Sequence, residues 1–127
     1  MRDGAVIITN NPYVKDKLGE SYPVIFKDMT YRDLLTDVRD RIHEGAVLMT
    51  HPLYGSVKPG ETPYRSLIVK EKKGPVDGRS LSLIEAAIAA CGKFADRTEI
   101  FRPDTLRDFQ FVDYSLLMSG IQSSETY

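Results

Sequence analysis

The chain has 127 residues, of which 42% are hydrophobic and 28% are charged, and its formal net charge is −1. These values are typical of one globular domain with its own core, and they exclude a nucleic-acid-binding surface built on excess positive charge. A single cysteine excludes an internal disulfide, which favours a cytoplasmic location. No apolar run has the length of a signal peptide core or a membrane span.

The first residues predict a strand followed by a short helix. Ala5–Ile8 is a run of mainly β-branched side chains, as in a buried strand. Asn11 can cap a helix that has Pro12 at its first position and ends at Gly19. A second short strand is expected at Pro23–Lys27. The chain therefore begins with a β-α-β pattern.

The next helix has the clearest pattern in the chain. Thr30 can cap it, and Asp33 complements the positive end of the helix. Gly45 is expected to end it, and a third strand at Ala46–Met49 follows directly. One stripe at helical spacing is expected to face the core: Tyr31, Leu34, Leu35, Val38 and Ile42.

The second half predicts one more strand and two helices. The strand is Ser66–Lys70, and Ser80 is expected to cap a helix that runs to about Ala95 and buries Cys91 as an inert thiol. Residues 104–119 predict a final helix, while the alternation around Gln110 leaves a strand as an alternative. The expected inward face of this helix is Leu106, Phe109, Val112, Leu116 and Ser119.

Strands that alternate with helices indicate an α/β fold. We expect one domain over residues 1–122, followed by a frayed polar tail at 123–127. The domain should contain a small, open, mostly parallel sheet of about four strands, Rossmann-like and covered by helices in three layers. With the strand order 2-1-3, the chain would reverse direction between the first and third strands, where ligands of such sheets usually bind.

The connection from Thr50 to Tyr64 is unusually long for a segment without its own helix or strand, which favours a functional role. His51 can act there as a general acid or base, or hold the loop through a hydrogen bond. Ser56 and Lys58 can hold an anion together with the backbone. The expected ligand-binding residues are Thr9, Asn10, Asn11, Thr50, His51, Ser56, Lys58 and Arg65. The spacing of His and Cys predicts no metal site, and no cofactor motif is present.

Four stretches together resemble the GrdX-type proteins: Ile7–Pro12, Thr50–Pro59, Glu61–Ser66 and Leu106–Gln110. The resemblance covers nearly the whole chain. It implies an accessory role in assembling or regulating the glycine, sarcosine and betaine reductases, with a reductase component as a protein partner, and it implies no catalytic residue. The chain has no cysteine pair, which argues against a catalytic subunit of the reductase.

Three functions follow as hypotheses. The first is an accessory protein with a small-molecule or anion site at the carboxyl ends of the first and third strands. The second is a small hydrolase or transferase that uses His51 as its acid or base. The third is a protein-interaction module in which Tyr13, Tyr54 and Tyr64 form a docking patch, as a monomer or a homodimer.

Overall fold

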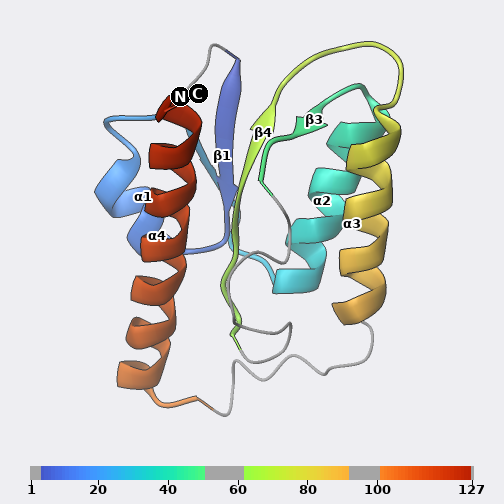
Figure 1. The fold of residues 1–127 in the computed structure, drawn as a ribbon. Helices are drawn as coiled ribbons and strands as arrows, with labels where there is room; N and C mark the ends of the chain where they lie inside the picture. Colours follow the sequence, from blue (N-terminus) through green and yellow to red (C-terminus); the bar gives the residue numbers. More distant parts are fainter. Residues whose placement is uncertain (1–3, 51–61, 92–100, 127) are drawn as a thin grey trace.

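The computed structural model describes residues 4–50, 62–91 and 101–126. These ranges contain, in chain order, β1 (Ala5–Thr9), α1 (Pro12–Leu18), β2 (Val24–Phe26), α2 (Tyr31–His43), β3 (Val47–Leu48), β4 (Ser66–Lys70), α3 (Gly78–Cys91) and α4 (Pro103–Thr126). The strands form one sheet of order β2-β1-β4-β3. Helices α1 and α4 cover one face of this sheet, and α2 and α3 cover the other (Figure 1).

The sheet is mixed, so the expected mostly parallel, Rossmann-like sheet is wrong. Strand β1 is parallel to β2, whereas β4 is antiparallel to both of its neighbours, β1 and β3. Antiparallel neighbours need no crossover helix, so β4 can return beside β3 and pair with β1 along its other edge. Because β4 lies between β1 and β3, the order 2-1-3 does not occur, and neither does the switch point that it would create.

Alternation along the central strands divides the core into two layers. Ile8 and Leu67 pack with α2 and α3, whereas Ile7 and Ile68 pack with α1 and α4. Thr9 lies two residues after Ile7, and its partner across the sheet is Ser66. The same alternation therefore turns these two hydroxyls toward the layer of α1 and α4.

The local signals in the first half of the chain are confirmed. The Asn11 side chain accepts from the backbone N–H of Tyr13 at 3.0 Å, with proline at the start of α1. The Thr30 hydroxyl accepts from the N–H of Asp33 at 3.1 Å. The whole predicted stripe of α2 is buried. Gly45 follows the end of α2 with φ +116°, which explains glycine at that position.

Helix α3 begins three residues earlier than expected, because Asp77 caps it and Ser80 does not. The Asp77 Oδ2 atom accepts from the Ser80 N–H at 3.0 Å and from its hydroxyl at 2.6 Å. The Ser80 oxygen in turn accepts from the N–H of Leu48 at 2.9 Å, which ties α3 to β3. At the other end of α3, Cys91 is buried as expected, and burial raises the pKa of its thiol.

Helix α4 is continuous from Pro103 to Thr126, so the strand alternative is wrong and the helix passes the expected end at Ser119. The expected inward face is wrong as well, because Val112 is 40% exposed. The buried side chains are instead Asp113, Leu117 and Ile121, which repeat every four residues on one face. None of the helices in the described part combines the length and the apolar character needed to span a membrane.

Candidate functional site

A directed series of hydrogen bonds joins β1, β4 and α4 inside the protein. The Asn11 backbone N–H donates to Thr9 Oγ1 at 2.9 Å, and the hydroxyls of Thr9 and Ser66 are 2.7 Å apart. The Ser66 hydroxyl donates to Asp113 Oδ2 at 2.7 Å. Since this uses the one hydroxyl proton of Ser66, the Thr9 hydroxyl must be the donor to Ser66. Every donor in the series therefore points toward Asp113.

The two oxygens of the Asp113 carboxyl group have different surroundings. Oδ2 accepts a second hydrogen bond, from Asn11 Nδ2 at 3.0 Å, in addition to the one from Ser66. Oδ1 is buried and has no hydrogen-bond partner among the described residues. Buried polar atoms in folded proteins nearly always have a partner. This oxygen is therefore an unused acceptor, in a side chain that is only 4% exposed.

Two buried ionisable side chains lie on the α2 side of this cluster. Arg65 is 1% exposed, and its Nε atom donates to the hydroxyl of Tyr31 at 2.9 Å. Burial raises the pKa of Tyr31, and the nearby Arg65 charge opposes that rise. Burial also raises the pKa of Asp113, opposed in turn by hydrogen bonds from Asn11 and Ser66 and by the Arg65 charge.

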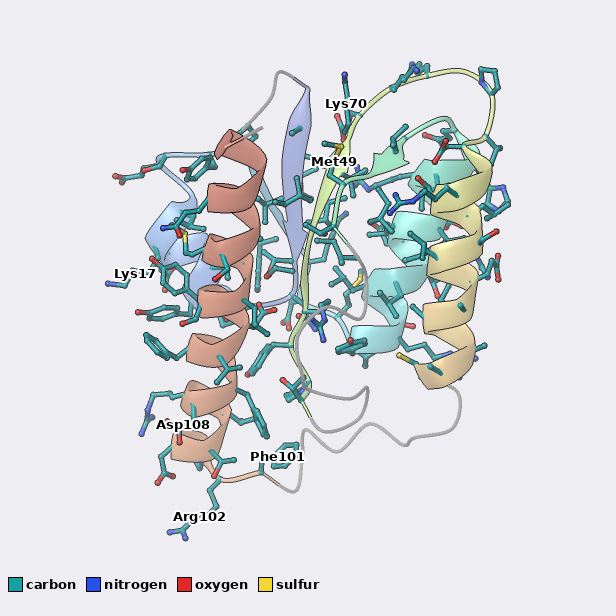
Figure 2. The ribbon with its side chains drawn as sticks, in the orientation of Figure 1. Lys17, Met49, Lys70, Phe101, Arg102 and Asp108 are labelled. Atoms are coloured by element: carbon teal, nitrogen blue, oxygen red, sulfur yellow. The ribbon has the colours of Figure 1, made fainter. Side chains whose placement is uncertain are left out.

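A small hollow lies against Asp113, where the segment before β4 meets the first half of α4. Its volume is about 200 Å³, part of it open to solvent, and its walls are Thr62, Tyr64, Arg65, Phe109, Val112, Asp113 and Leu116. Figure 2 shows Phe101 at the same end of α4, with Asp108 pointing away from the sheet. The rings of Phe101 and Phe109 meet edge to face, with centroids 5.0 Å apart.

The structure brings together four of the predicted site residues: Thr9, Asn10, Asn11 and Arg65. The side chain of Asn10 joins the end of β1 to the segment before β4, because its Oδ1 accepts from the N–H of Arg65 at 2.9 Å. Its Nδ2 donates to the carbonyl groups of Met29 and Pro63, at 3.0 and 2.9 Å. Asn11 uses its own Nδ2 on Asp113 and on the carbonyl of Gln110. Both amides are thus engaged within the protein.

Thr50 does not join this cluster. Its hydroxyl accepts from the backbone N–H of Ile68 at 3.0 Å, and its methyl group lies against Gly120. Gly120 follows Asp113 by two turns of α4, which is about 10 Å along the helix axis. The other predicted ligand-binding residues, His51, Ser56 and Lys58, lie outside the described residues, as does Tyr54.

The remaining tyrosines of the predicted docking patch have separate contacts. Tyr13 packs edge to face on Tyr114, with ring centroids 5.1 Å apart. The hydroxyl of Tyr64 accepts from Gln110 Nε2 at 2.9 Å, at the hollow. Within the part of the chain that the structure describes, no group of three or more His, Cys, Asp or Glu side chains could hold a metal ion.

Asp113 and Ser66 are the members of the buried polar cluster that the sequence analysis missed. A carboxylate between apolar helix residues is usually on the solvent side, so Asp113 was excluded from the predicted inward face. The signal that could have found it is the spacing of Leu117 and Ile121, which extends back by four residues to Asp113. Ser66 was included only as the first residue of a strand.

The raised pKa of Asp113 predicts a specific pH dependence of stability. In the unfolded chain this carboxyl group titrates near its ordinary pKa of about 3.9. The folded state binds the proton more tightly, so the free energy of unfolding falls as pH rises from that value through the folded pKa. Asp113→Asn removes this contribution. In urea unfolding at a series of pH values, the stability of the natural chain relative to Asp113→Asn should decrease with pH and then level off. An increase with pH would contradict a raised pKa.

These features define a small α/β protein with a mixed sheet and a buried polar cluster beside a surface hollow. The family model described as GrdX-like protein matches residues 6–122, nearly the whole chain. The chain therefore belongs to the GrdX-like protein family, which associates it with glycine reductase-related systems. No curated protein and no solved structure matches the chain.

Proposed function

We propose that this protein is an accessory component of glycine, sarcosine or betaine reductase metabolism, and that it acts by binding a small molecule in the hollow beside α4. Membership of the GrdX-like family supports the metabolic link. The buried carboxyl group of Asp113, a residue that lines the hollow and has one oxygen without a partner among the described residues, carries the proposal of a site.

The free-energy cost of burying the carboxyl group of Asp113 supports a functional role for this residue. It occupies the buried stripe of α4 together with Leu117 and Ile121, where an apolar side chain would pack without loss of hydration. Replacing buried charged groups by apolar ones of similar volume is often neutral or stabilising. Hydrogen bonds from Asn11 and Ser66 offset part of the cost, but only at Oδ2.

The proposed site differs from the expected one in position. It lies at the carboxyl end of β1 and the amino end of β4, rather than at the ends of β1 and β3. Arg65 also lines this hollow, but its Nε is engaged with Tyr31, so we take the unpartnered oxygen of Asp113 as the ligand contact, which favours a neutral or positively charged ligand group.

A variant that fills the hollow tests the proposal. Val112 lines the hollow and is 40% exposed, so Val112→Trp should occupy the space without breaking the polar cluster. Phe111→Trp is the matched control, because Phe111 precedes it, is 57% exposed and does not line the hollow. In a host that reduces glycine, deletion of the gene should slow reductive glycine consumption. The natural chain and Phe111→Trp should restore the rate, and Val112→Trp should not.

Two results of this experiment would count against the proposal. An unchanged rate of glycine consumption in the deletion strain would remove the metabolic role. Full restoration by a folded Val112→Trp protein, with its fold verified by circular dichroism, would remove the hollow from the function.

A further inference from the structure

We infer that the hollow binds a small molecule through a protonated amine, which donates an N–H to the Oδ1 atom of Asp113. The inference rests on the proposed function, since it specifies the ligand class for the same hollow. It places the amine at the one buried side-chain oxygen that lacks a partner among the described residues.

When the carboxyl group of Asp113 is ionised, the directions of the hydrogen bonds leave Oδ1 as an acceptor that needs a donor. Oδ2 already accepts from Ser66 Oγ and Asn11 Nδ2, at 2.7 and 3.0 Å. When the carboxyl group is ionised, both oxygens are acceptors only, so Oδ1 can be satisfied only by a group that carries a hydrogen. Hydrogen bonds between an ionised acceptor and an ammonium donor are among the stronger ones in proteins.

The walls of the hollow suit a small amine. Phe109 and Tyr64 line the same hollow as Asp113, and the faces of aromatic rings attract cations. Val112 and Leu116 add aliphatic surface that can contact a short carbon chain.

Asp113→Asn separates the ligand contact from the internal network. The asparagine oxygen must take the Oδ2 position, because Asn11 and Ser66 both donate to that position. The amide nitrogen then takes the Oδ1 position and presents hydrogens where the carboxylate presents lone pairs. The substitution therefore keeps the internal hydrogen bonds and converts the proposed acceptor into a donor.

The test compares glycine, sarcosine, dimethylglycine and betaine, which have the same carboxylate and lose one amine hydrogen at each step, to none in betaine. Binding to the full chain is followed at neutral pH by NMR, using the side-chain amide of Asn11, which contacts Asp113 directly. We expect affinity to fall along the series. Betaine should bind about 10- to 100-fold more weakly than glycine, and Asp113→Asn should weaken glycine binding by a similar factor.

Several results would overturn the inference. Betaine binding as tightly as glycine would show that no N–H contact is made, and equal binding of acetate would show that the amine is not recognised. Binding of none of the four compounds would overturn it too, and so would a folded Asp113→Asn protein with unchanged glycine affinity. The comparison of the four ligands on the natural chain needs no variant. If Val112→Trp still fails to restore glycine consumption, the proposed function stands while this inference falls.

Discussion

Replacing Arg65 by methionine should lower the free energy of unfolding by about 3–5 kcal/mol, the range found when one partner of a buried charged group is removed. Arg65 is among the largest fully buried side chains, and its Nε donates to the hydroxyl of Tyr31. Its charge also opposes the cost of ionising Asp113. Methionine keeps much of the volume but leaves the Tyr31 acceptor unused and the Asp113 charge uncompensated. Urea unfolding measures the effect.

A double-mutant cycle measures how much of the stability lost in Arg65→Met depends on Asp113. In Arg65→Met combined with Asp113→Asn, no carboxylate remains to be compensated. We expect the double variant to be more stable than the sum of the single effects predicts, with a coupling of about 0.5–3 kcal/mol. Strict additivity, or a loss below about 1 kcal/mol for Arg65→Met, would show that Arg65 is not electrostatically tied to the site.

Replacing Gly45 by alanine should lower the free energy of unfolding by about 3 kcal/mol or more, because a side chain there is both strained and blocked. Gly45 has φ +116°, a conformation that residues with a side chain rarely adopt. A Cβ atom would lie 2.5 Å from the backbone nitrogen of Gly74 and 2.8 Å from the carbonyl oxygen of Lys72. Backbone atoms must move to relieve these overlaps. Thermal or urea unfolding measures the loss.

Substitutions at two other glycines distinguish the cost of an unfavourable backbone conformation from the cost of steric overlap. Gly74 also has a positive φ, +146°, but a Cβ atom there would meet nothing within 4 Å. Gly74→Ala should therefore show only the conformational cost of about 1–2 kcal/mol. Gly78 in the first turn of α3 has neither problem, and Gly78→Ala should raise stability by up to about 1 kcal/mol. Equal losses for Gly45→Ala and Gly74→Ala would contradict a close approach at Gly45.

Local signals predicted the first half of the fold because they act within a few residues. Asn11 and Thr30 satisfy backbone N–H groups two or three positions ahead, so their capping roles can be recognised from neighbouring residues. The prediction of the buried apolar stripe of α2 was also correct, because the inward positions from Tyr31 to Ile42 hold no polar residue. Strand β4 was predicted with its observed bounds, Ser66–Lys70.

The order of the strands could not be predicted in the same way. An apolar strand has the same pattern in either direction, and nothing in Ser66–Lys70 indicates that it runs antiparallel between β1 and β3. The β-α-β-α-β pattern suggested that β3 would lie beside β1. The pairing of β4 with both strands depends on contacts between residues far apart in the chain, such as Thr9 with Ser66.

Part of the buried polar cluster could be predicted from the sequence for a related reason. Thr9, Asn10 and Asn11 were recognised because polar residues at the end of a strand are conspicuous in the sequence. Asp113 was missed because a carboxylate on the buried face of a helix contradicts the usual pattern of amphipathic helices. Such local conflicts are expected at functional positions, where stability is not the only requirement.

The ¹³C chemical shift of the Asp113 carboxyl group, followed over pH with and without glycine, shows whether this group is the ligand contact. We expect a midpoint above the ordinary aspartate pKa of about 3.9, because burial favours the protonated form. Saturating glycine should lower that midpoint, because the ammonium group binds the ionised carboxylate. A midpoint at or below the ordinary value, or one that glycine leaves unchanged, would contradict this role of Asp113.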